Sequence, residues 1–69
     1  MRVGSLWLVV YMTHSESRAD AVERMLQDEG FLVRRRVLNR AISGAGAYEL
    51  SVLESEAQEA RQLLDEKGL

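Results

Sequence analysis

The segment Leu6–Met12 (LWLVVYM) most constrains how this chain can fold, because all of its residues are apolar and none is charged. Trp, Val and Tyr favour extended structure, so we expect a strand over Ser5–Met12. The run is too short to span a bilayer and lacks the small-residue cleavage site of a secretory signal. We therefore interpret it as a strand of a cytoplasmic protein.

This first strand is apolar on both of its faces. Helices cover one face at most, so large apolar side chains remain uncovered on the other. We favour packing of the aliphatic set against the helices, although alternation alone leaves the choice open. Strict alternation divides the strand into Leu6, Leu8, Val10 and Met12 on one face and Trp7, Val9 and Tyr11 on the other.

The rest of the chain separates into a helix, two strands and a second helix. Ser17 and Asp20 have the spacing of a capping box, Val22, Met25 and Leu26 recur at helical spacing, and Gly30 supplies a stop. Ser55 and Gln58 form a second capping box, and Lys67 is expected in the last turn before Gly68. The expected elements are a helix over 17–29, strands over 31–38 and 47–53 around a loop at 39–46, and a helix from 55 to 67.

The element order is therefore β-α-β-β-α within one domain, residues 1–69. A right-handed strand–helix–strand unit followed by a hairpin has few compact solutions. The most favourable one places the third strand between the first and second, with both helices on one face. We predict an α+β fold, ferredoxin-like but lacking the last strand, with sheet order 1-3-2.

Three consecutive arginines lie in the second strand, which is an edge strand in this topology. Alternation directs Arg35 toward the helices, where its stem can lie on the core while its guanidinium passes the sheet edge. Arg34 and Arg36 then point to the uncovered face, opposite Glu49 and Ser51 of the third strand. Charge along an edge also discourages aggregation between sheets.

Three stretches carry a family resemblance: LWLVVYM, EGFLVRRR and YELSVLESEAQEA. Together they resemble very short bacterial proteins described as signal-transducing and related in structure to PII-like nitrogen regulators. Some members are named glutamate decarboxylases. The resemblance implies a small ferredoxin-like fold and no established activity. PII regulators bind effectors through a long loop, whereas the matching segment here is the short NRAISGAG.

The residues argue against catalysis and against a bound cofactor or metal. Pyridoxal-phosphate chemistry needs a lysine, and Lys67 is the single lysine, in a terminal helix with solvent as its expected neighbour. The chain has no cysteine and one histidine, His14, so zinc ligands are missing. The Gly-rich SGAG lacks the Lys and Ser/Thr of a phosphate loop. We expect no enzyme activity, no cofactor and no metal.

Two binding alternatives remain open at this stage. His14, Ser15 and Ser17 lie where a helix begins, and together with Arg34 and Arg36 they could contact an anion or an acidic partner. The uncovered sheet face could instead bind single-stranded RNA by stacking bases on Trp7 and Tyr11. The acidic third strand and a net charge of −2 disfavour RNA.

The leading hypothesis is a non-enzymatic regulatory or protein-interaction module that acts as a homodimer. A chain of 69 residues buries little core, and self-association is the remaining way to bury more surface. An uncharged edge strand is a template for pairing with another chain. The predicted interface residues are Trp7, Leu8, Val9, Val10 and Tyr11, used by edge pairing, by packing of the uncovered face, or by both.

Overall fold

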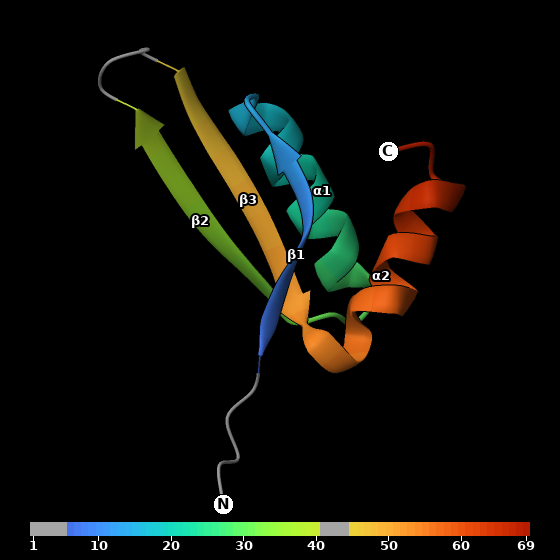
Figure 1. Ribbon diagram of the computed structural model, residues 1–69. Helices are drawn as coiled ribbons and strands as arrows, with labels where there is room; N and C mark the ends of the chain where they lie inside the picture. Colours follow the sequence, from blue (N-terminus) through green and yellow to red (C-terminus); the bar gives the residue numbers. More distant parts are fainter. Residues whose placement is uncertain (1–5, 41–44) are drawn as a thin grey trace, which may run out of the picture.

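The computed structural model describes residues 6–40 and 45–69, which form an open sheet covered on one side by helices (Figure 1). β3 lies between β1 and β2 and pairs antiparallel with both, so the sheet order is 1-3-2. This confirms the predicted α+β fold and its ferredoxin-like topology without a final strand. The elements are β1 (Trp7–Thr13), α1 (Glu16–Asp28), β2 (Val33–Arg40), β3 (Ala45–Leu53) and α2 (Glu54–Glu66).

The core lies between the central strand and the two helices. Leu50 and Val52 of β3 and Leu26 of α1 are fully buried. Ala57 and Ala60 line the inner side of α2, and their small side chains let this helix lie close to the sheet. The remaining buried members of the cluster are Val22, Phe31 and Leu64.

Both helices end on a glycine in the left-handed region, as predicted. Gly30 has φ 99° and Gly68 has φ 74°, conformations that residues with a Cβ rarely adopt. The N–H of Phe31 donates to the carbonyl oxygen of Leu26 at 3.0 Å, the six-to-one bond of a Schellman motif. This turn brings Phe31 back over the core.

The helix starts differ from the predicted capping boxes. Ser15 is the N-cap of α1, and its Oγ accepts from the N–H of Arg18 at 3.2 Å, so the predicted cap Ser17 lies inside the helix. α2 begins at Glu54 without a side-chain cap, so the predicted box at Ser55 is also wrong. Here the strand runs directly into the helix, and the N–H of Glu54 donates to the carbonyl oxygen of Leu6 at 2.8 Å instead.

The strand boundaries also shift. β2 begins at Val33, two residues later than predicted, because Phe31 belongs to the turn that ends α1. The predicted loop 39–46 is shorter, since Arg40 pairs with Ala45 and the hairpin continues. Residues 41–44 of that loop, and Ser5 at the predicted start of the first strand, lie outside the described residues. Lys67 follows α2 as its C-cap instead of lying in its last turn.

Neither of the helices in the described part of the chain has the length and apolar character needed to cross a membrane.

Truncation of the core should cost far more than truncation of an exposed leucine. Leu26 has no exposed surface, whereas Leu32 is 61% exposed. We expect Leu26→Ala to lower the free energy of unfolding by about 2–5 kcal/mol, through lost burial and the cavity left behind. Leu32→Ala should change it by less than about 0.5 kcal/mol. Urea denaturation followed by circular dichroism measures both, and equal losses would contradict the described core.

Candidate interaction surface

An irregularity in β1 decides which of its side chains face the helices. Val9 lies opposite Ser51 and Tyr11 lies opposite Leu50, so Val10 is an extra residue between the two pairs. Directly opposite residues of antiparallel strands share one face of the sheet. Because Leu50 is buried beneath the helices, Tyr11 also turns to that side.

This β-bulge corrects the predicted faces of the first strand. Leu8 and Val10 do pack against the core, as the favoured interpretation has it, but Tyr11 joins them. Met12 lies opposite Glu49 and moves to the side away from the helices. Strict alternation fails because a bulge inserts one residue and reverses the pattern beyond it.

The open face, defined here as the side of the sheet away from the helices, carries an apolar column along β1. The column consists of Trp7, Val9 and Met12, with Leu53 of β3 opposite Trp7. Val9 is 40% exposed and Met12 is 54% exposed. Of the predicted interface residues, Trp7 and Val9 therefore lie on the open face, while Leu8, Val10 and Tyr11 are half-buried against the core.

Arg34 and Trp7 meet across the central strand on the open face. The guanidinium carbon of Arg34 lies over the Trp7 ring, 5.5 Å from its centroid, which is within range of a cation–π contact. Ser51 lies opposite both Arg34 and Val9, and it is 9% exposed although no helix covers this face. The long side chains of Arg34 on β2 and Trp7 on β1 meet across β3 and explain the burial of Ser51.

Arg36 and Glu49 occupy the next rung of the open face. The register places them directly opposite each other, as predicted. The ion pairs among the described residues are nevertheless those of Arg35 on the other face, so Arg36 and Glu49 are neighbours without a direct ion pair.

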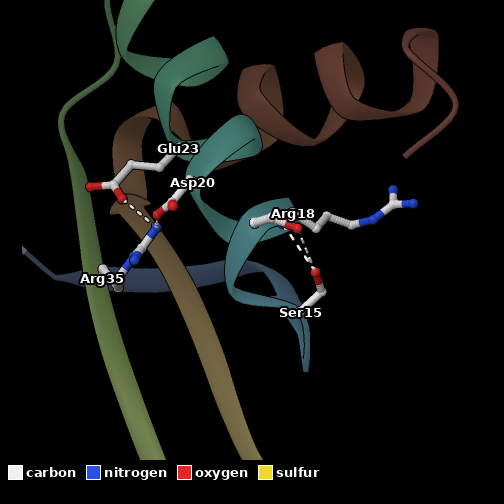
Figure 2. Close-up of polar contacts among 6 residues, drawn as sticks. Ser15, Arg18, Asp20, Glu23 and Arg35 are labelled. Atoms are coloured by element: carbon white, nitrogen blue, oxygen red, sulfur yellow. Dashed lines mark hydrogen bonds and ion pairs between the residues drawn. The ribbon is translucent and has the colours of Figure 1, made fainter.

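Arg35 joins β2 to α1 on the helix side (Figure 2). Its Nη2 lies 2.6 Å from Oδ1 of Asp20 and 3.0 Å from Oε1 of Glu23. The guanidinium also lies 5.7 Å from the centre of the Tyr48 ring. The hydrogen bond to Asp20 raises the pKa of Arg35 above its ordinary value, although partial burial opposes the shift. This arginine is a structural link between sheet and helix.

The free edge of β1 is partly occupied by Arg61 of α2. The carbonyl oxygen of Leu6 accepts a hydrogen bond from the N–H of Glu54 at the end of β3. Backbone groups alternate in direction along a strand, so those of Trp7 and Val9 point away from β3. Nη2 of Arg61 donates to the carbonyl oxygen of Val9 at 3.4 Å, a long hydrogen bond. A charged side chain therefore lies along the edge at the point where the bulge begins.

The predicted anion-contact residues separate into two places. His14 donates from Nδ1 to the carbonyl oxygen of Gly46 at 2.8 Å and so ties the end of β1 to the hairpin. Ser15 caps α1, and its Oγ lies 3.1 Å from that of Ser17. These three residues lie at the start of α1, whereas the register puts Arg34 and Arg36 on the open face. The structure does not bring the two groups together.

Concave surfaces are found on the helix side. A shallow groove of about 400 Å³ runs between α1 and the end of the chain. It is lined by Ser15, Ser17, Arg18, Ala21, Val22, Met25 and Leu69. Within residues 6–40 and 45–69, no cluster of three or more His, Cys, Asp or Glu side chains could hold a metal ion.

Sequence reasoning missed the contact made by Arg61, the stacking of Arg34 on Trp7, and the presence of Met12 and Leu53 on the open face. Arg61 has the appearance of an ordinary exposed helix residue, and no signal in its spacing indicates a contact with the Val9 carbonyl. The stacking of Arg34 on Trp7 joins outer strands that never pair with each other. That contact follows from the predicted order 1-3-2, because side chains on the two flanking strands can reach across a small residue such as Ser51 between them.

The neighbouring arginines Arg35 and Arg36 should differ in their effect on stability. Arg35→Gln removes two charged contacts from a side chain that is 22% exposed, so we expect a loss of about 1–2 kcal/mol. Arg36→Gln on the open face is the matched control and should change the free energy of unfolding by less than about 0.5 kcal/mol. Thermal and urea unfolding measure both. A larger loss for Arg36→Gln would contradict the described contacts.

Comparison with known proteins adds no relative: no family model matches the chain, and no curated protein or solved structure matches it. The functional argument therefore depends on the geometry of the open face.

Proposed function

We propose that this protein is a non-enzymatic interaction module of a regulatory or signal-transducing kind and that it functions as a homodimer. The observation that carries the proposal is the apolar column Trp7, Val9 and Met12, which no helix of the described chain covers and of which Val9 and Met12 are exposed. A sheet normally buries its apolar face against another layer. Contiguous apolar surface on a small protein is typical of an interaction site.

The distribution of polar side chains supports a role without catalysis. His14 and Ser15 are engaged in local hydrogen bonds, and the described residues around them form no oriented pair of base and nucleophile. Arg35 is held by two carboxylates of the same chain. The resemblance of the sequence to short bacterial proteins described as signal-transducing is the ground for proposing a regulatory kind of module.

RNA binding is the weaker alternative. The bulge turns Tyr11 toward the helices, so the open face of the described strands presents one aromatic ring, Trp7, instead of two. Arg34 already lies over that ring, and Glu49 lies in the centre of the face. RNA-binding sheets instead stack bases on aromatic residues of their central strands. A small-anion sensor has less support, because the serines at the start of α1 bond to each other and to the helix.

Self-association is the first testable consequence. We expect sedimentation equilibrium to show a reversible monomer–dimer equilibrium with a dissociation constant of about 1–100 µM, because the available face is small for a protein interface. A chain that stays monomeric up to about 1 mM would contradict the homodimer.

RNA binding should be absent. Fluorescence polarisation with a labelled single-stranded RNA at low salt, where electrostatic attraction is strongest, should show no change at micromolar protein. Glu49→Gln is a useful comparison because it removes the negative charge from the face. Saturable binding by the natural sequence would instead favour the RNA alternative.

A further inference from the structure

We infer that two copies associate by packing open face against open face, and not by adding strands along the free edge of β1. The inference rests on the proposed self-association and specifies its partner and geometry. The contact surface is the apolar column Trp7, Val9 and Met12 together with Leu53, and Arg34 lies over Trp7 at one end of this column. Tryptophan and arginine are the residue types enriched at the energetic centres of interfaces.

The edge of β1 is poorly suited to strand addition. A partner strand needs a straight row of free N–H and C=O groups. The bulge between Val9 and Tyr11 interrupts that row, and Arg61 already donates to the outward carbonyl oxygen of Val9. Bulges and charged side chains are the devices by which edge strands avoid pairing.

Within residues 6–40 and 45–69, by contrast, no helix covers the open face. The helices cover one side of the sheet, and the other side exposes Val9 and Met12 at 40% and 54%. Stacking a second sheet on this side would give four layers, with two sheets in the middle and helices outside. Sheets packed in this way lie about 10 Å apart, with their side chains interdigitated.

The size of the face suits a reversible dimer. Three strands about 4.8 Å apart and seven residues of about 3.4 Å each span a flat area of roughly 340 Å². Side-chain relief increases the accessible area, but it stays near or below the roughly 800 Å² that each partner of a standard interface buries. We therefore expect contact that forms at micromolar and not at nanomolar concentration.

The charges are compatible with a second copy of this chain. Arg36 lies on the outer strand β2, whereas the guanidinium of Arg34 reaches across β3 to Trp7 of the other outer strand. A two-fold axis that is parallel to the strands and passes between β1 and β3 sets β1 of one copy against β3 of the other and leaves the two β2 strands on opposite margins. The centre of the interface is then formed by β1 and β3 of both copies, with Glu49 beside Met12, and Arg36 lies at the rim.

Trp7 gives a direct reading of the contact, because it is the single tryptophan of the chain. We expect its fluorescence emission to shift to longer wavelength on dilution, with the same midpoint as the sedimentation data, because dissociation exposes the ring to water. A dissociation midpoint in the sedimentation data without any change in Trp7 emission would place the contact elsewhere.

Matched lysine substitutions separate the two sides of the sheet. Met12→Lys puts a charge on the open face beside Glu49, where the monomer tolerates it, and should weaken the dimer by about tenfold or more. Val37→Lys is the control: Val37 is 48% exposed, but its register partner Tyr48 lies on the helix side. It should leave the dissociation constant within about threefold. Circular dichroism checks that both variants are folded.

Arg61→Ala tests the edge. Face packing predicts an unchanged dissociation constant, whereas edge pairing predicts tighter association because the Val9 carbonyl becomes free. If the natural chain dimerises, but Met12→Lys has no effect or Arg61→Ala tightens the dimer, the face-to-face inference is overturned and the homodimer stands. If the natural chain remains monomeric, both are overturned.

Discussion

The extra residue in β1 is the constraint on which the character of this small protein depends. Without it, Tyr11 would lie on the open face and Met12 would face the helices. With it, the ring of Tyr11 fills space beneath the helices, while Met12 extends the apolar column that begins at Trp7. A bulge also twists and interrupts the strand. One local irregularity therefore adds apolar surface to the open face and at the same time makes the edge less suitable for pairing.

The run of three arginines shows how strand alternation gives identical side chains different roles. Arg35 faces the helices and is held by Asp20 and Glu23, so it fixes α1 against the outer strand. Arg34 faces the other way and lies over Trp7. Arg36 stands opposite Glu49 without a direct ion pair. Charge in this strand is thus compatible with a two-layer fold, because one arginine forms ion pairs with the helix layer and two lie at the surface.

Much of this fold could be predicted from the sequence, because its determinants are local. The apolar spacing of α1, the glycines at 30 and 68 and the alternation of Tyr48, Leu50 and Val52 each depend on neighbours in the chain. The bulge could not be predicted, because an uninterrupted apolar run such as LWLVVYM has no polar residue to mark where alternation reverses. The prediction of where the helices begin failed for a related reason. Ser15, Ser17 and Ser55 are all plausible caps, and contacts with the rest of the fold select among them.

The small size of the domain bears on the proposed self-association through the open face. Three strands with two helices bury a core of few residues, and a chain of this length leaves much of its apolar surface in contact with water. Covering the open face would add a second apolar layer without lengthening the chain. The stability of the folded protein would then depend on its concentration, because binding to the folded state alone shifts the unfolding equilibrium. The central strand β3 directs Leu50 and Val52 toward the helices and Ser51 and Glu49 toward the open face, so one strand contributes to both the core and the open face.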